Sequence, residues 1–539
     1  MITDPRHLAK PTKAQAEWHD YELGMFVHWF PISYEELDMD RLQDPDYQRM
    51  KSGKVHCAEF DPEQWVQSAV DLGAKYIVFV AKHGMGFCLW QTEYGEFSLN
   101  NAPYRGDPVG ALYTACAARG LKMGVYLAGI SYNYGAEDLG VLPDPERQRQ
   151  YNTLYRNWLT ELLSRYGEMT EVWFDGSLCI EVGDILKKYA PNAMVFQSKY
   201  ATIRWVGQEE GYASDPAYNS LSRYDALSGV STQRHGDPDG DAWMPLECDA
   251  RLRNDWGWSD DLERNRLRSV DELMSMYYRS VGHGAVMLIN QAPNPGGRII
   301  DEDMARMKAF GDEIRRRFST PIAETRGEGD VVELPLGGVK KVDHVIIMED
   351  IWHGERMRIY VVEGYDGAQW KRLSAGTAVG HKKIDYFEEA EVSAVRVRAL
   401  DSIGTPIIRA FAAYYVGETP VITEQPARGL YKLGDWGTEM YDLETYSAHF
   451  HYPIDAFIDD AGQYRVTVKV ARDATPFIVE RAWIEINGVA HEEYVSRADG
   501  ENVFDIYIGG SGSKVEFHMT SRYDRTPHLA GEAYIQRIM

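Results

Sequence analysis

Short apolar runs alternate with amphipathic segments from Gly24 to about Thr325, and this alternation is the strongest constraint on the fold. Each run is short enough for a buried strand, and the segments between the runs have helical periodicity. Strands are expected at residues 24–28, 76–81, 123–128, 171–174, 194–198 and 285–289, with a less regular seventh at 243–246. Helices are expected at residues 61–72, 109–119, 148–166 and 269–280. Repeated β/α units of this kind predict an α/β fold, a (β/α)8-like TIM barrel, although eight clean strands are not found.

The second part of the chain has a different periodicity. Beyond a helical segment at 301–318, apolar and polar residues alternate with a period of two, which is typical of antiparallel sheets. Examples lie at residues 341–348, 356–362, 392–399 and 463–470. Residues 418–434, with Pro420 and Pro426, have the composition of a connector. The predicted domains are a barrel over 1–325, a β-sandwich over 326–417 and a second β-sandwich over 418–539.

Charge and composition limit the partners of the chain. The formal net charge of -25 repels polyanions, so neither nucleic acid nor an anionic membrane is expected as a partner. The first 20 residues lack an apolar core and the longest apolar runs are too short to span a bilayer, so a cytoplasmic protein is expected. Five cysteines without CxxC spacing, and no HExxH motif, predict no disulfide framework, metal site or other cofactor. A homo-oligomer remains an open alternative.

Polar residues follow the predicted strands. Asp175 ends the apolar run 171–174, and Gly176 then turns the chain. Other strand ends lead to His28-Trp29, Lys82-His83, Ser131-Tyr132, Ser198-Lys199, Glu247 and Asn290. In a barrel these positions meet at one mouth, where reacting groups are held. A helix cap or a pair with an arginine is the alternative role for Asp175.

Two carboxylates at such a mouth, with histidines and aromatic residues beside them, fit glycoside hydrolysis. Asp175 and Glu247 are the candidate pair, because Glu247 also follows a short apolar run. A salt bridge to Arg251 or Arg253 is the alternative for Glu247. Aromatic residues make up 12% of the chain, and aromatic faces stack well on the C–H faces of sugars.

Several motifs resemble those of the α-L-fucosidases of glycoside hydrolase family 29. They occur in order along the first 325 residues: Gly24-Met-Phe-Val-His-Trp29, Ala74-Lys-Tyr-Ile-Val-Phe-Val-Ala-Lys-His83, Val172-Trp-Phe-Asp-Gly176, Ile203-Arg-Trp-Val-Gly-Gln-Glu-Glu-Gly211, Pro245-Leu-Glu-Cys-Asp249, and Tyr277-Tyr-Arg-Ser-Val-Gly282 continuing to Leu288-Ile-Asn290. The segments 204–211 and 245–249 are most similar to the subgroup that acts on α-1,3/1,4-fucosylated glycans. The resemblance implies a retaining exo-glycosidase without a cofactor, with Asp175 as nucleophile, Glu247 as acid/base and a fucosylated oligosaccharide as substrate.

The resemblance also implies a set of sugar contacts. With the strand-end pattern it gives eight substrate-binding candidates: His28, Trp29, His83, Trp90, Tyr132, Arg204, Trp205 and Trp256. Glu209 is expected beside the leaving group. The chain departs from the family pattern at Gly84-Met85 and at Arg251–Trp256, so two alternatives stay open. One is a related retaining glycosidase with another sugar or aglycone, such as an α-L-galactoside, and the other is a glycan-binding protein without turnover.

Overall fold

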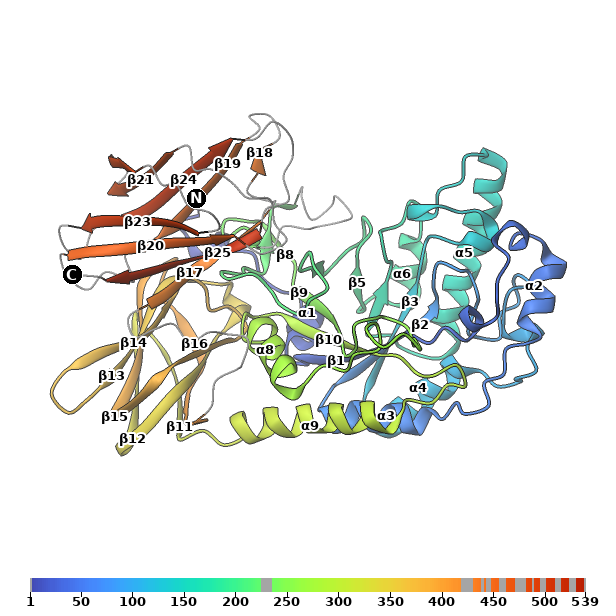
Figure 1. Cartoon of the computed structure of the whole chain (residues 1–539), viewed down its shortest axis with the longest axis horizontal. Coiled ribbons are helices and arrows are strands. Elements are labelled where there is room, and N and C mark those ends of the chain that lie inside the picture. Colours follow the sequence, from blue (N-terminus) through green and yellow to red (C-terminus); the bar gives the residue numbers. More distant parts are fainter. Residues whose placement is uncertain are drawn as a thin grey trace.

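The computed structural model consists of a barrel at one end and two antiparallel β units at the other (Figure 1). It describes residues 2–223, 235–417, 430–437, 441–442, 447–454, 462–470, 481–486, 489–494, 501–508, 515–522 and 530–537. The predicted α/β architecture, a TIM-like barrel followed by C-terminal β-sandwich units, is confirmed.

Eight parallel strands form the barrel, in the order β5-β4-β3-β2-β1-β10-β9-β6. A parallel bridge between Phe196 and Ile203 joins the two outer strands, so the barrel is nearly closed. The strands are β1 (Leu23–Val27), β2 (Tyr76–Lys82), β3 (Lys122–Leu127), β4 (Glu171–Trp173), β5 (Met194–Phe196), β6 (Arg204–Trp205), β9 (Leu246–Arg251) and β10 (Val286–Gln291).

The prediction of a barrel strand at 243–246 is wrong. The barrel strand of this region begins at Leu246, while β8 (Ala242–Trp243) pairs outside the barrel with β7 (Ser220–Leu221). β6 was not predicted, because a strand of two residues is too short to show a period.

Helices lie around the barrel, and all the predicted ones are present. α3, α4 and α5 each begin with an Asp-Pro pair, in which the Asp side chain accepts a backbone N–H and proline occupies the first turn. The helices are α1 (Lys13–His19), α2 (Pro45–Ser52), α3 (Pro62–Leu72), α4 (Pro108–Ala118), α5 (Pro145–Arg165), α6 (Gly183–Tyr189), α8 (Val270–Ser280) and α9 (Asp301–Phe318). Short 3-10 turns lie at Pro5–His7, Pro31–Tyr34, Met39–Arg41, Leu99–Asn101, Tyr132–Tyr134, Asp138–Gly140 and Ile351–His353. Among the described helices, none combines the length and the apolarity that crossing a membrane requires.

Alternation along the barrel strands separates two cores. On β1, Met25 and Val27 face the outer core with the helices, whereas Phe26 lies in the barrel interior. The interior contains Tyr126 and Trp173, and Trp18 of α1 packs into the same cluster. α1 therefore covers the amino-terminal end of the barrel and leaves the carboxyl end as the mouth.

The first β unit is one six-stranded antiparallel sheet, in the order β11-β16-β12-β15-β13-β14. Its long strands, β12 and β15, pair with breaks in register that bend the sheet around a core containing Val345, Val395 and Phe411. The strands are β11 (Ala323–Glu328), β12 (Val331–Glu349), β13 (Met357–Tyr365), β14 (Trp370–Gly376), β15 (Lys383–Ser402) and β16 (Ile407–Tyr414). The sheet thus begins at Ala323, slightly before the predicted boundary.

The second β unit consists of a four-stranded sheet, β17-β25-β20-β23, and a five-stranded sheet, β18-β19-β24-β21-β22. Phe450, Val466, Phe517 and Ile535 share one core between the sheets. The strands are β17 (Leu430–Gly437), β18 (Tyr441–Asp442), β19 (Ser447–Pro453), β20 (Gly462–Val470), β21 (Arg481–Ile486), β22 (Val489–Tyr494), β23 (Glu501–Ile508), β24 (Val515–Arg522) and β25 (Ala530–Arg537). Of the predicted connector, residues 418–429 lie outside the described residues and 430–434 belong to β17.

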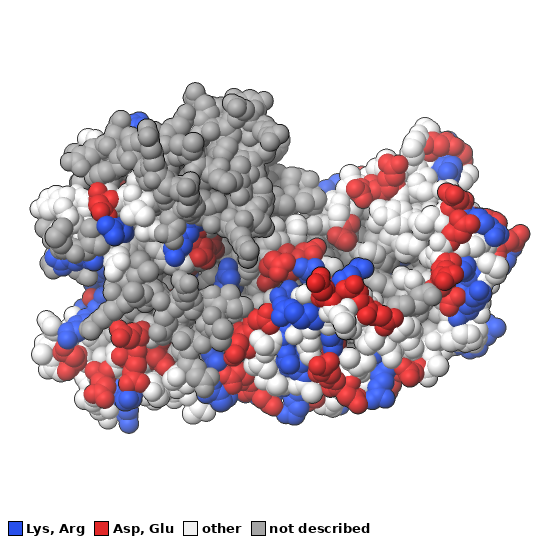
Figure 2. All heavy atoms as spheres, in the orientation of Figure 1, with Lys and Arg blue, Asp and Glu red and all other residues white. Residues whose placement is uncertain are grey.

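Buried polar contacts dock the first β unit onto the barrel. Glu355 accepts a hydrogen bond of 2.8 Å from Asn219 Nδ2, and Lys382 Nζ lies 2.7 Å from a carboxylate oxygen of Glu22. On the face drawn in Figure 2, the described acidic and basic side chains are interspersed over the barrel and the sheets. The two ionic and hydrogen-bonded contacts therefore join the barrel to the first β unit.

Candidate active site

Asp175 lies at the carboxyl end of β4, as predicted. Its side chain is exposed, and Tyr126 on the neighbouring β3 donates a hydrogen bond of 2.8 Å from its hydroxyl to Asp175 Oδ2. Gly176 and Ser177 follow with φ of 69° and 74°, which turns the chain sharply away from the strand. The next helix, α6, has Val182 as its N-cap, so Asp175 is not a helix cap. The carboxylate is oriented by one fixed donor and remains open to a ligand.

Two histidines, His28 and His83, line the same mouth. His83 stacks on the Tyr126 ring at 5.6 Å, and its pKa is lowered by burial although the Asp175 carboxylate acts in the opposite direction. The His28 ring lies 6.1 Å from that of His83. Both predicted positions therefore stand beside Asp175.

The hydrogen bonds around His28 settle its tautomer. Asn290 Nδ2 donates to the Trp256 carbonyl at 2.8 Å, so the other amide atom, Oδ1, must accept from His28 Nδ1 at 2.7 Å. Burial and the nearby His83 lower the pKa of His28 to about 3, so the ring is neutral. Its Nε2 lone pair is then available to accept a hydrogen bond from a hydroxyl group.

Glu247 does not share the mouth with Asp175, and this prediction is wrong. Glu247 is the second residue of β9 and is fully buried. Its Oε2 accepts from the hydroxyl of Tyr76, the first residue of β2, at 3.2 Å, and its charge interacts with Glu171, the first residue of β4. These contacts place Glu247 at the amino-terminal end of the barrel, where Trp18 Nε1 donates to Glu171 at 3.0 Å.

Burial and mutual repulsion decide the protonation of the pair formed by Glu171 and Glu247. Burial raises the pKa of Glu171 to about 7, and burial together with Glu171 raises the pKa of Glu247 well above the usual range. Glu247 is therefore a protonated, solvent-excluded carboxyl group. The predicted ion pairs with Arg251 or Arg253 are not formed either, since those arginines pair with Glu210 and Asp303.

A second group of acidic residues lies closer to the mouth. Asp249 is two residues beyond Glu247 on the same face of β9 and accepts a hydrogen bond of 2.6 Å from Trp205 Nε1. Its pKa is raised to about 8, first by burial, with the charges of Glu209 and Asp175 acting in the same direction. Asp249 thus lies within electrostatic reach of both Asp175 and Glu209.

Glu209 is the exposed carboxylate of this group. It stands on the loop after β6, with 45% of its side chain exposed, and accepts a hydrogen bond of 2.9 Å from Trp256 Nε1. The Trp256 ring lies 5.0 Å from that of His28. Trp256 therefore connects Glu209 to the histidine side of the mouth.

Three predicted contacts lie away from the mouth. Trp29 is fully buried in the outer core and stacks on Phe60, because strand alternation turns it away from the barrel interior when His28 faces inward. Trp90 is fully buried and donates to Glu161 at 2.9 Å. Arg204 is buried and donates to the backbone carbonyls of Met244 and Tyr218.

Tyr132 and Gly84 lie side by side on the loops that follow β3 and β2. The Tyr132 ring is 45% exposed, and a Cβ atom on Gly84 would stand 3.6 Å from it. The Tyr132 backbone N–H donates to the Gly84 carbonyl at 2.8 Å. The aromatic ring therefore lies beside the position at which the chain departs from the family pattern.

Sequence reasoning missed Tyr126 and Asp249 as parts of the site. Both lie inside barrel strands, so the pattern of polar residues at predicted strand ends does not select them. Alternation offers a signal for Tyr126, because it is in phase with inward-facing Gly124 and Ala128 on the predicted strand.

Proteins of known family are similar to this chain in sequence. The family model described as alpha-L-fucosidase matches residues 4–316, more than half of the chain. The Arabidopsis thaliana protein "Alpha-L-fucosidase 1" is 26% identical over 434 residues, covering 70% of this chain and 81% of its own length.

Two solved structures are similar in both sequence and fold. A Bacteroides thetaiotaomicron structure assigned as an α-L-fucosidase is 33% identical with a TM-score of 0.68, covering 76% of this chain and 100% of that one. A mutant GH29 fucosidase of Ruminococcus gnavus, solved in complex with fucose, is 25% identical with a TM-score of 0.66, covering 75% of this chain and 94% of that one. The chain belongs to the α-L-fucosidase family, glycoside hydrolase family 29.

Proposed function

We propose that this protein is a retaining exo-α-L-fucosidase that removes terminal α-L-fucosyl residues, with Asp175 as the nucleophile. The observation that carries the proposal is the exposed Asp175 carboxylate, which Tyr126 holds at 2.8 Å opposite two histidines in the mouth of the barrel. Membership of a family of glycoside hydrolases supports the reaction class. The presence of fucose in the related Ruminococcus gnavus structure supports the sugar.

The reaction would proceed by two displacements. A carboxylate oxygen of Asp175 attacks the anomeric carbon, the bond to the leaving oxygen breaks, and a protonated carboxyl group gives that oxygen its proton. The same acid, now a carboxylate, takes a proton from water as the water attacks the anomeric carbon and releases Asp175. Fucose leaves with its original anomeric configuration, because each displacement inverts it.

Glu209 replaces Glu247 in our proposal as the acid/base. An acid that serves a leaving group must be reachable by substrate, and Glu209 is exposed whereas Glu247 is fully buried. The indole of Trp256 orients the Glu209 carboxylate, and the electrostatic effect of both Asp175 and Glu209 on Asp249 supports their location around one mouth. Asp249 itself is 5% exposed and bonded to Trp205, so we assign it a positioning role.

The anomer formed first and the response to single substitutions test this assignment. Proton NMR of early hydrolysis should show α-L-fucose before mutarotation, and β-L-fucose as the first product would refute retention. Asp175→Asn should abolish turnover of an aryl α-L-fucoside, whereas activity equal to wild type would exclude Asp175 as nucleophile. Fucose binding by the wild type without turnover of any activated aryl glycoside would favour the glycan-binding alternative.

The acid/base assignment needs a matched pair of variants. Glu209→Gln should slow hydrolysis of a substrate with a poor leaving group by roughly 10²–10⁴-fold and that of a dinitrophenyl fucoside much less. The control is Glu210→Gln, because Glu210 is the adjacent exposed carboxylate and pairs with Arg251 at 2.9 Å. Equal losses in the two variants would reject Glu209 as the proton donor.

The sugar and the linkage are the finer parts of the proposal. The motifs at 204–211 and 245–249 support α-1,3/1,4-linked fucose, and a panel of 2-, 3- and 4-linked fucosyl oligosaccharides tests this preference. The exposed Tyr132 ring beside Gly84 favours a second candidate, a glycosidase for a related sugar such as α-L-galactose. Comparison of kcat/KM for aryl α-L-fucoside and α-L-galactoside decides between the two sugars.

A further inference from the structure

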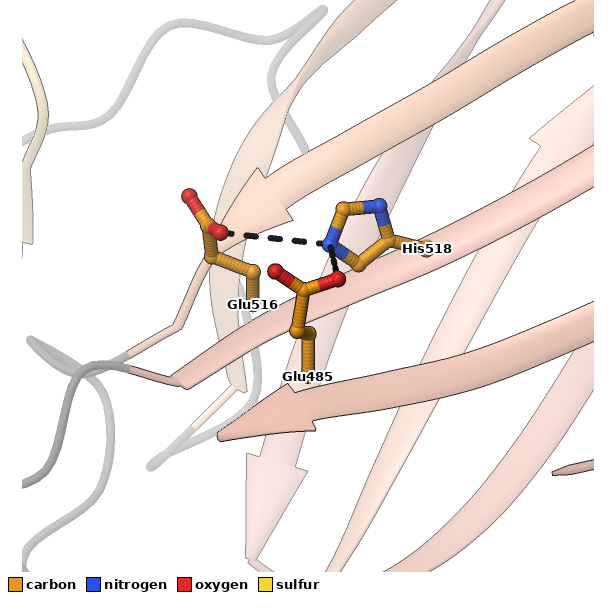
Figure 3. Close-up of side chains that lie close together, drawn as sticks. All are labelled: Glu485, Glu516 and His518. Atoms are coloured by element: carbon orange, nitrogen blue, oxygen red, sulfur yellow. Dashed lines mark ion pairs between the residues drawn. The ribbon is translucent and has the colours of Figure 1, made fainter. Parts of the chain in front are cut away.

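The five-stranded sheet of the second β unit, β18-β19-β24-β21-β22, carries a cluster of three polar side chains. None of the three belongs to the barrel. His518 and Glu516 lie on β24, and Glu485 lies on the adjacent β21 (Figure 3). Their neighbours Phe517 and Ile484 are in the core of the unit, so alternation turns the three polar side chains toward the outer face. One potential ligand atom from each lies within 4.8 Å of the other two.

The register of the sheet brings the two carboxylates together. Glu485 and Glu516 are direct partners across β21 and β24. His518 pairs with Trp483, and each of these two residues lies two positions along its strand from the glutamate pair, on the same face of the sheet. Like charges directly opposite each other on antiparallel strands destabilise a sheet. A cation between these strands would reverse the sign of that interaction.

His518 points an unpartnered nitrogen at this pair. The residue is 7% exposed, and its Nε2 is buried without a hydrogen-bond partner among the residues that the structure describes. The Nε2 atom lies 3.8 Å from Glu485 Oε2 and 3.9 Å from Glu516 Oε2, beyond hydrogen-bond distance (Figure 3). Buried polar groups are almost always hydrogen-bonded, so a buried Nε2 atom in this position indicates that a ligand atom binds there.

The rest of the His518 ring is held as a metal-binding imidazole requires. Its Nδ1 lies 3.1 Å from His449 Nε2, which can accept the Nδ1 proton and leave the Nε2 lone pair facing the carboxylates. The indole of Trp483 stacks on the His518 ring at 4.9 Å with an interplanar angle of 9° and fixes its plane. The ring is thus oriented from two sides toward the carboxylates.

We propose that His518, Glu485 and Glu516 form a binding site for a divalent transition-metal cation of the Zn²⁺ class. Imidazole together with carboxylate suits Zn²⁺ better than Ca²⁺ or Mg²⁺, which take oxygen ligands. Ligand atoms around a tetrahedral Zn²⁺ stand about 3.4 Å apart, so the separations of 3.8 and 3.9 Å need to close by only a few tenths of an ångström. Three protein ligands leave a fourth position for water, and the bound ion would cross-link β21 to β24.

Zinc binding to the full chain tests the site. Protein stripped with EDTA and dialysed should bind one equivalent of Zn²⁺ in calorimetry, and Zn²⁺ should raise the melting temperature. Glu485→Gln and Glu516→Gln are nearly isosteric substitutions at partly buried carboxylates, so the fold is expected to survive them. Each should weaken Zn²⁺ binding at least tenfold, and His518→Ala should remove it together with the thermal shift.

His353→Ala is the matched control. His353 is an exposed histidine whose Nδ1 lies 3.3 Å from Asp350 Oδ2, the kind of surface pair that can collect zinc adventitiously. This substitution should leave both the affinity and the thermal shift unchanged. Equal Zn²⁺ affinity in the wild type and the three cluster variants, loss of binding in His353→Ala, or no binding by the wild type would overturn the proposal. Excess Ca²⁺ should fail to displace Zn²⁺, and displacement would contradict the imidazole ligand.

Discussion

Glu247→Gln tests whether Glu247 takes part in catalysis, as the sequence predicts for both Asp175 and Glu247. The structure places Glu247 in a closed cluster with Tyr76 and Glu171 at the amino-terminal end of the barrel. A glutamine has the same shape and can still donate a hydrogen bond to Glu171. Activity on an aryl α-L-fucoside should therefore stay within about threefold of wild type, against a loss of roughly 10²–10⁴-fold for an acid/base.

The same substitution should change stability in alkaline solution. Glu171 has a folded pKa of about 7 in place of 4.5, so its ionisation in the folded protein costs roughly 3 kcal/mol at high pH. A raised carboxyl pKa means that the folded state holds more protons, so this contribution to the free energy of unfolding is full below pH 4.5 and is lost as pH rises through 7. The raised pKa of Glu247 causes a further loss of stability as pH rises, and glutamine at position 247 removes this loss because it cannot ionise.

Urea unfolding at pH 5 and pH 9 measures the effect. We expect Glu247→Gln to match wild type at pH 5 and to be more stable at pH 9 by roughly 1 to 3 kcal/mol. Glu247→Ala is the contrasting variant, because it removes the donor to Glu171 and leaves a cavity, and it should be less stable at both pH values. A loss of activity in Glu247→Gln comparable to that of Glu209→Gln, with the fold intact, would refute the reasoning.

Three further expectations concern the mouth and its surroundings. Tyr126→Phe removes a hydrogen bond of 2.8 Å to Asp175. Because a hydrogen bond to a charged group contributes about 1.5–3 kcal/mol, kcat/KM should fall by roughly 10- to 100-fold. The melting temperature should change little. Asp249→Asn keeps an acceptor for Trp205 but removes a carboxyl group whose pKa is raised to about 8. The free energy of unfolding of this variant, measured in urea, should therefore increase relative to that of wild type from pH 4 to pH 8. Trp29→Ala should cost about 3–5 kcal/mol in unfolding free energy and leave KM unchanged in protein that folds, since the indole packs in the outer core; a raised KM at unchanged stability would restore Trp29 to the sugar site.

The nucleophile candidate and its neighbours could be predicted from local signals. An apolar run that ends on Asp175 and Gly176 identifies the strand end without knowledge of the other strands. His28 and His83 follow runs of the same kind, and the structure brings both beside Asp175. Helix starts were also predictable, because Asp-Pro caps act within one turn of chain.

Glu247 shows why the second carboxylate could not be placed in the same way. The apolar run at 243–246 looks like a strand that ends before Glu247, but β9 begins at Leu246 and pairs with β10 and β6. The position of a residue along a barrel strand depends on pairing with distant segments, and a shift of a few residues moves a side chain from one end of the barrel to the other. Trp29 and Trp90 were misplaced for a related reason, because residue type and position in the sequence do not state which face of a strand or loop each ring occupies.

The barrel, the antiparallel units after it and a carboxylate at the end of a barrel strand could all be predicted from the sequence, because apolar periodicity and turn residues act over a few positions. Which other carboxylates lie near Asp175 depends on the pairing of strands that are distant in the sequence. Glu247, Glu209 and Asp249 have the same acidic chemistry in the sequence, but the structure buries Glu247 and Asp249 at different depths of β9 and leaves Glu209 half-exposed on the loop after β6. Depth decides protonation and access, and these two properties separate a structural carboxyl group from one that can transfer a proton.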